Sequence, residues 1–199
     1  MCSTSLRRSS LAPRNDVSFM NRFTAEGIII KRRNIGEADR ILTVLTKEQG
    51  KIQVKAKGVR KIPSRRASHI ELLNYSQFTL YKGQFLPILT EAHNIETFAD
   101  IKCNLKKVGI AYHVCEIIDG LCPENQEHRQ VFYLFKDILE KLASHETIFP
   151  AIHAFEISLL QELGYVSSND HLNNMKPSLF IENILEKKLK SRQILPQLL

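Results

Sequence analysis

The residues best suited to chemistry lie at positions 51–66, KIQVKAKGVRKIPSRR, and the chemistry they suit is the binding of anions. The segment holds seven Lys or Arg and no Asp or Glu. Because side chains alternate between the two faces of a strand, its apolar positions would enter a core and the other face would carry Lys51, Lys55 and Lys57. A row of like charges on a rigid sheet is unfavourable unless an anion binds to it. The pattern therefore predicts a surface that binds a polyanion.

The excess positive charge of the chain lies in its first half. Of the formal net charge of +7, residues 1–21 carry +2, residues 22–96 carry +7 and residues 97–199 carry −2. The alternative is a solvated face that only keeps the protein soluble, and scattered charges would favour it. The clustering favours nucleic-acid binding instead. The residues predicted to contact the sugar-phosphate backbone are Lys31, Arg32, Arg33, Arg40, Lys51, Lys55, Lys57, Arg60, Lys61, Arg65 and Arg66.

Aromatic residues indicate whether such a surface holds bases or backbone, because single-strand binders stack bases on exposed rings. The chain has no Trp, and in its first half only Tyr75 and Tyr81 share a strand face that could be exposed. The alternative is that these two tyrosines cover one end of a barrel. A surface rich in charge and poor in rings is expected to hold backbone and to accept both single and double strands.

No catalytic motif is present. The sequence lacks a phosphate-binding Gly-x-x-x-x-Gly-Lys-Ser/Thr loop, a Gly-x-Ser-x-Gly elbow and a His-Glu-x-x-His zinc motif. Glu37 and Asp39 flank a turn beside Arg40, where a local ion pair is a better interpretation than an acid/base couple. The sequence therefore predicts a protein that is not an enzyme and that has no cofactor.

The cysteines and histidines do not predict a metal site. Cys115 and Cys122 are seven residues apart on one predicted helix, which separates them by about 10 Å at about 1.5 Å per residue. Two thiolates bound to one zinc ion at about 2.3 Å cannot be that far apart. The histidines have no Cys-x-x-Cys partner. Four cysteines are also too few and too dispersed for a disulfide framework, which indicates a reducing, cytoplasmic setting.

The pattern of apolar residues changes near residue 97, and this change predicts an α+β fold. Before it, short alternating runs are broken by Gly, Asn and Ser, and after it apolar residues recur every three or four positions. We expect a flexible tail over 1–22, with a transit peptide as the alternative, then a five-stranded OB-type β-barrel over 23–96 and an all-helical domain without a zinc site over 97–199. The strands are predicted at 24–33, 40–46, 51–57, 75–81 and 87–93.

Four amphipathic helices are predicted in the second half: from Ala99 to Pro123, over 125–143, over 150–163 and from Leu179 onward. The last helix is basic and suits a membrane surface, but docking on the other helices is favoured. No apolar run is long enough to cross a membrane. The cations of this last helix are expected to line a groove for an acidic peptide with an apolar tip. These cations are Lys187, Lys188, Lys190 and Arg192.

A resemblance to the RecO family of bacterial DNA repair proteins is carried by the stretch EGIIIKRRNIGEADRILTVLTKEQGKIQVKAKGVRKIPSRR, which is similar to the family's N-terminal OB domain. The segments LYKGQFLPILTEA, LQELGY and LKSRQILPQLL resemble its last barrel strands, its helical domain and its C-terminal helix. The likeness covers about residues 23–199. Its most specific residues are Gly36-Glu37-Ala38-Asp39-Arg40, Thr46, Gly50-Lys51, Lys57-Gly58 and Ser64.

One feature departs from that family. Many members carry a cysteine zinc site after the Leu-Gly-aromatic segment, whereas here Gly164-Tyr165 leads into VSSNDHLNNMKP, which has no cysteine. The resemblance therefore implies a member without metal.

The resemblance implies a non-enzymatic recombination mediator in the cytoplasm, associated with the nucleoid and not with a membrane. Such proteins bind single- and double-stranded DNA, anneal complementary strands, associate with RecR and bind the C-terminal tail of single-stranded-DNA-binding protein. They thereby help RecA to load on coated gaps. Two other interpretations stay open from the residues alone. One is an RNA- or ribosome-associated OB protein, and the other, ranked third, is a nuclease that uses Glu37 and Asp39 with magnesium.

Overall fold

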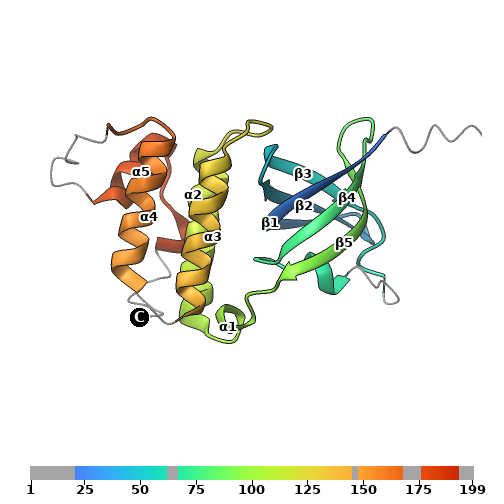
Figure 1. The fold of residues 1–199 in the computed structure, drawn as a ribbon, viewed down its shortest axis with the longest axis horizontal. Coiled ribbons are helices and arrows are strands. Elements are labelled where there is room, and N and C mark those ends of the chain that lie inside the picture. The colour runs from blue at the N-terminus through green and yellow to red at the C-terminus, as the bar shows by residue number, and fades with distance from the viewer. Residues whose placement is uncertain (1–20, 62–66, 145–147, 168–175, 193–199) are drawn as a thin grey trace, which may run out of the picture.

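The computed structural model describes residues 21–61, 67–144, 148–167 and 176–192. Figure 1 shows two parts packed side by side, a small β-barrel from the first half of the chain and a group of helices from the second half. The predicted α+β fold, with a five-stranded OB-like barrel followed by helices, is confirmed.

Five strands close into a ring in the order β1-β2-β3-β5-β4. Neighbouring strands are antiparallel except β3 and β5, which meet in parallel where Lys55 lies opposite Ile88. No strand end lies more than three residues from its predicted position. The strands are β1 (Arg22–Ile35), β2 (Asp39–Thr46), β3 (Gly50–Ala56), β4 (Tyr75–Tyr81) and β5 (Ile88–Glu96), with a short 3-10 helix, η1 (Ala67–Ile70), before β4.

The interior of the barrel is filled by the side chains that strand alternation predicts to be buried. Ile52, Val54 and Ala56 of β3 pack there with Phe78 and Leu80 of β4. Because a strand has a period of two, this burial directs the intervening residues of β3 to the outside of the barrel.

Five α-helices follow the barrel in the described part of the chain, and within these ranges none has the length and apolar character that a membrane span requires. Gly164, after the fourth of them, has a φ of 77°, the left-handed conformation predicted for a helix end. The helices are α1 (Ala99–Lys102), α2 (Leu105–Leu121), α3 (Arg129–Ala143), α4 (Ile148–Glu162) and α5 (Pro177–Leu185).

The helix predicted from Ala99 is interrupted. The side-chain oxygen of Asn104 accepts hydrogen bonds from the backbone N–H groups of Lys106 and Lys107, at 3.0 and 3.3 Å. Asn104 therefore caps the N-terminus of a new helix, α2. The predicted start of the next helix at residue 125 is also wrong, because α3 begins at Arg129.

The predicted last helix ends earlier than expected. Glu186 adopts a left-handed φ of 51° and terminates α5, so the lysines at 187 and 188 lie after the helix and not on it. The chain becomes helical again at Lys190. No Gly or Pro marks this break in the sequence, which is why the helical period alone did not reveal it.

The barrel and the helices share one apolar core. Ile28 and Leu45 of the barrel are buried in the same cluster as Ile118 of α2 and Phe132 of α3. The ring of Tyr75 meets the ring of Phe132 edge to face, with 5.8 Å between their centroids. A continuous apolar core of this kind opposes movement of one part against the other.

The turn between β2 and β3 is covered by the segment between α2 and α3. The backbone N–H of Asn125 donates to the carbonyl of Lys51 at 2.8 Å. Gly50 has a φ of 66°, and a Cβ placed on it would lie 1.7 Å from the carbonyl oxygen of Gln126. Glycine is required here both by the left-handed backbone and by the close approach of the neighbouring chain.

We expect Gly50→Ala to lower the free energy of unfolding by more than the roughly 1–3 kcal/mol of a strained backbone position, because the new Cβ also displaces Gln126. Chemical denaturation measures this loss. Gly36→Ala is the matched control, since Gly36 has a φ of 55° but a Cβ there has no neighbour within 4 Å. Equal losses in the two variants would contradict a packing role for Gly50.

Candidate nucleic-acid interface

One end of the barrel gathers three turns next to one another. The backbone N–H of Arg60 donates to the carbonyl of Ala38 at 3.0 Å, which joins the segment after β3 to the β1–β2 turn. The backbone N–H of Lys55 donates to the carbonyl of Pro87 at 2.8 Å, which joins the end of β3 to the β4–β5 loop. We call this end the rim, and it comprises residues 22, 33–40, 55–61 and 81–88.

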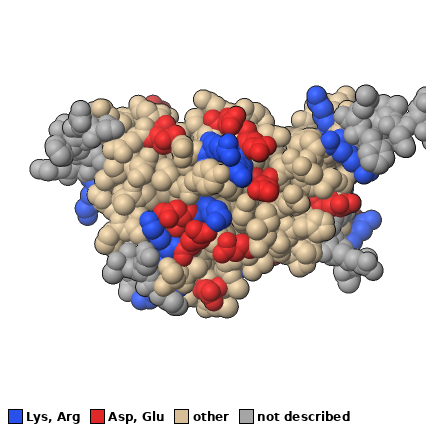
Figure 2. Space-filling model, in the orientation of Figure 1, with Lys and Arg blue, Asp and Glu red and all other residues tan. Residues whose placement is uncertain are grey.

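The rim is strongly basic, with eight Lys or Arg against two acids, Glu37 and Asp39. Its β4–β5 loop lies on the far side of the barrel from α2 and α3 (Figure 1). In Figure 2, basic and acidic side chains are interleaved over the helices. The excess of one sign on the rim is the electrostatic feature of a phosphate-binding face. The basic residues are Arg22, Arg33, Arg40, Lys55, Lys57, Arg60, Lys61 and Lys82.

Hydrogen bonds to neutral groups position two guanidinium groups on the rim. Arg60 donates to the carbonyl of Gly36 at 3.0 Å, and Arg40 donates to the side-chain oxygen of Asn34 at 3.1 Å. Neither acceptor carries a charge, so these bonds orient the two side chains without neutralising them.

Asp39 organises the rim from within. Its carboxylate accepts a hydrogen bond from the backbone N–H of Gly58 at 2.9 Å and lies 3.2 Å from Nζ of Lys55. The bond from Gly58, followed by the contact with Lys55, holds the pKa of Asp39 below its ordinary value. The local ion pair with Arg40 that the sequence predicted at this turn is not formed, because Asp39 pairs with Lys55 of β3 and Arg40 bonds to Asn34.

The prediction of an exposed row of three lysines on β3 is wrong for Lys51. Its side chain is buried, and Nζ donates to the backbone carbonyl of Asp119 at 2.5 Å and lies 3.6 Å from the Asp119 carboxylate. Alternation correctly directs Lys51 away from the barrel interior, but α2 covers that position. Lys51 therefore joins the barrel to the helices and does not stand on an open face.

Two further residues of the predicted cationic surface also face carboxylates. Lys31 lies 2.7 Å from Asp119 of α2, and Arg32 lies 2.6 Å from Glu71. Both belong to the part of β1 that adjoins the helical half. The single cationic surface expected from the sequence is therefore divided between the rim and this inner side of β1. The predicted contacts at Arg65 and Arg66 lie outside the described residues.

The rim also contains an aromatic residue that the sequence-based prediction missed. Phe85, in the β4–β5 loop, is 88% exposed. Of the two interpretations of Tyr75, the structure agrees with the one in which the ring covers the barrel, because it is buried against the helices. A signal for Phe85 was present, since it stands between Gly83 and Pro87 in a loop, where a large apolar side chain has no core to enter.

A second basic site lies between the barrel and the helices. It is a cavity of about 390 Å³ with walls from β1, α2 and the segment after α5. Three of the four residues predicted to bind a partner peptide line it, whereas Arg192 forms an ion pair with Glu182 at 2.5 Å. The cations that line the cavity are Lys31, Arg32, Lys187, Lys188 and Lys190. The acids are Glu116 and Asp119, and the remaining side chains are Ile30, Leu72, Tyr112 and Cys115.

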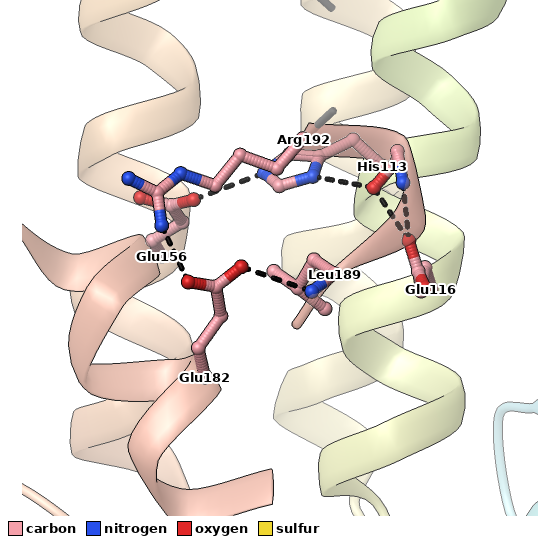
Figure 3. Close-up of polar contacts among 7 residues, drawn as sticks. His113, Glu116, Glu156, Glu182, Leu189 and Arg192 are labelled. Carbon is pink, nitrogen blue, oxygen red and sulfur yellow. Dashed lines mark hydrogen bonds and ion pairs between the residues drawn. The ribbon is translucent and has the colours of Figure 1, made fainter. Parts of the chain in front are cut away.

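Carboxylates hold the segment that carries the three cavity lysines (Figure 3). Glu116 of α2 accepts hydrogen bonds from the backbone N–H groups of Lys190 and Ser191, at 3.0 and 2.9 Å. Glu182 accepts one from the N–H of Leu189 at 2.9 Å, and the Leu189 side chain is fully buried. Burial alone would raise the pKa of Glu116, but the bonds from Ser191 and Lys190 lower that pKa below its ordinary value.

His113 extends this network into the helices. Its Nδ1 lies 2.9 Å from the hydroxyl of Ser191, and its Nε2 lies 3.2 Å from the carboxylate of Glu156 on α4. In Figure 3 the imidazole lies between these two groups. His113 is therefore a buried structural residue that ties the segment after α5 to α2 and α4.

Within the described ranges, no three His, Cys, Asp or Glu side chains lie together as metal ligands would. Burial raises the pKa of Cys122 to about 11 and also raises the pKa of Cys115. Both thiols therefore stay protonated near neutral pH and are poor metal ligands.

Comparison with protein-family models shows to which family the chain belongs. Residues 20–98 match the model described as Recombination protein O N terminal, and residues 104–171 match the one described as Recombination protein O C terminal. This chain belongs to the RecO family of DNA repair proteins. The resemblance to RecO noted in the sequence is confirmed.

RecO proteins of several bacteria are similar to this chain. The DNA repair protein RecO of Roseiflexus sp. (strain RS-1) is 36% identical over 143 residues, which are 72% of this chain and 50% of that protein. RecO of Acetivibrio thermocellus is 37% identical over 147 residues, which are 73% of this chain and 59% of that protein. The chain thus spans about half the length of the RecO proteins that it matches.

Tyr75→Phe is expected to change how stability depends on alkaline pH. Burial, and the hydrogen bond from its hydroxyl to Glu26 at 3.0 Å, raise the pKa of Tyr75 from 10.0 to about 12. The folded state holds the proton of the Tyr75 hydroxyl more tightly than the unfolded state does. The contribution of this hydroxyl to the free energy of unfolding is therefore complete below about pH 10 and is lost as the pH rises to about 12. The variant should be less stable by about 1 kcal/mol at about pH 8, and this difference should shrink above about pH 10.

Urea denaturation at a series of pH values measures the difference. Tyr81→Phe is the control, because Tyr81 is only half-buried at the other end of β4. A difference for Tyr75→Phe that stays constant across this range would contradict the role of its hydroxyl proton.

Proposed function

We propose that this chain binds single- and double-stranded DNA through the rim and acts as a recombination mediator that anneals complementary strands. One observation carries the proposal: eight basic residues and two acidic ones meet at one end of the barrel, on the side away from the helices. Membership of a family named for DNA repair favours DNA over RNA as the polyanion.

Annealing requires charge neutralisation and no bond making. Two single strands repel each other through their phosphates, and a basic surface that contacts both backbones lowers this repulsion while it leaves the base edges free to pair. Each phosphate contact also releases counterions, so the affinity for a single strand falls with salt with a log–log slope of about −0.7 per contact. The nuclease alternative has little support, because Asp39 already binds Gly58 and Lys55.

The cavity between β1 and α2 suits the C-terminal tail of single-stranded-DNA-binding protein, taken as an acidic peptide with an apolar tip. Its lysines would pair with the carboxylates of the tail, and Ile30, Leu72 and Tyr112 offer apolar contacts for the tip. A mediator held in this way on coated single strands, together with RecR, would help RecA to load on gaps.

A rim variant, in which Lys57, Arg60 and Lys61 are all replaced by Gln, is expected to bind single-stranded DNA more weakly and to anneal strands more slowly. Loss of about three phosphate contacts should reduce the log–log salt slope by about 2. Fluorescence anisotropy of labelled DNA over a range of salt concentrations measures the slope, and the rate of duplex formation from labelled strands measures annealing.

The matched control is a cavity variant, in which Lys187, Lys188 and Lys190 are replaced by Gln, because it removes the same number of charges from the other basic site. It should keep the salt slope and the annealing rate of the unaltered protein. Equal losses in the two variants would mean that total charge, and not the rim, governs DNA binding.

The cavity variant also tests the peptide site. We expect it to bind a peptide that copies the acidic tail at least about tenfold more weakly, because charge-assisted contacts to carboxylates are lost. The rim variant should bind the same peptide as the unaltered protein does. Isothermal titration calorimetry measures both affinities, and an unchanged affinity in the cavity variant would place the peptide elsewhere.

A further inference from the structure

Phe85 is the most exposed large apolar side chain among the residues that the structure describes, at 88%. Water around a phenyl ring is unfavourable, and Phe78 of the same barrel is buried while Phe23 is half-buried. A single apolar side chain on a surface is common in proteins. The surroundings of Phe85 therefore decide whether its exposure has a role.

The loop that carries Phe85 is fixed to the barrel at both ends. At its start, the backbone N–H of Lys82 donates to the carbonyl of Asn21 at 2.8 Å. At its end, the carbonyl of Pro87 accepts the 2.8 Å hydrogen bond from Lys55 of β3. Both anchors lie in or next to the rim, so the loop is part of that surface.

The loop is also closed tightly between its ends. A Cβ on Gly83 would lie 2.2 Å from the carbonyl oxygen of Leu86, so these two backbone segments touch across the turn. Phe85 therefore extends from a compact turn. A ring held in this way loses little conformational freedom when a flat partner stacks on it.

Two basic residues of neighbouring strands lie beside the ends of the loop. Arg22 lies opposite Tyr81 at the end of β4, and Lys55 lies opposite Ile88 at the start of β5. A protein partner would be expected to cover a larger apolar patch, whereas an exposed ring among phosphate-binding cations is how proteins hold single-stranded nucleic acid.

We propose that Phe85 stacks on an unpaired base of the DNA strand whose backbone the rim binds. The inference rests on the proposed DNA binding of the rim and adds a base contact to it. Bases within a duplex are stacked on both faces, so only an unpaired base can offer its face to the ring. The rim therefore discriminates between strands: Phe85 strengthens binding to single strands and adds nothing to binding of an intact duplex.

Phe85→Trp gives a direct test, because the chain has no Trp and the new indole would be its only one. Stacking of a base on the indole should quench its fluorescence when a single-stranded oligonucleotide is added, and a blunt duplex of the same length should not. Phe149→Trp, at a ring 60% exposed on α4, is the matched control and should show no quenching.

Phe85→Leu supplies the second measurement. It should weaken binding to single strands about 5- to 100-fold, the effect of losing one stacked base, and leave duplex binding unchanged. Anisotropy of labelled DNA in the same samples reports binding independently of the indole. If the Phe85→Trp protein binds DNA by anisotropy without quenching, or if Phe85→Leu leaves single-strand affinity intact, the stacking role is refuted and DNA binding by the rim stands. Absence of DNA binding in the unaltered protein would refute both.

Discussion

The contact between Lys51 and Asp119 is the interaction on which the arrangement of both basic surfaces depends. The ammonium of Lys51 is buried, and it is satisfied by the backbone carbonyl and the carboxylate of a single residue of α2. A buried ammonium that loses its carboxylate partner is unfavourable, because its charge is no longer compensated. Together with the apolar core that the barrel and the helices share, this contact holds α2 against the barrel. Once α2 is fixed, the inner side of β1 becomes a cavity wall and the rim stays on the far side.

The two basic surfaces meet along β1 without a gap. Lys31 and Arg32 line the cavity, and Arg33, the next residue, belongs to the rim. An acidic peptide in the cavity would neutralise cations on one side of the strand and leave those of the rim to DNA. Two adjoining basic surfaces, one on the rim and one in the cavity, would let two anionic ligands bind together, where a single surface would make them compete.

Local sequence patterns predicted the strands of the barrel well. They predicted less well which of its charged side chains are exposed to solvent. Alternation located β3 and buried Val54 correctly, because the period of a strand depends only on its own residues. Whether Lys51 faces water depends on α2, which is far away in the sequence, so no local pattern could reveal it. The break at Asn104 could have been found from its capping chemistry, whereas the left-handed Glu186 gives no local signal. Phe85 lies in a loop, where strand alternation says nothing about which side chains are exposed.

A surface for annealing must hold a strand firmly enough to bring it to its partner and loosely enough to release the duplex. Charge alone does not meet both needs, since a duplex presents more phosphates per unit length than a single strand and would be held more tightly. A stacked base would act against this order, because the contact exists only while the base is unpaired. If Phe85 stacks as proposed, pairing of the base would remove the ring's partner, and the affinity of the rim for that strand would fall. A single exposed ring among the cations would in this way favour release of the product, which a rim made only of lysine and arginine could not do.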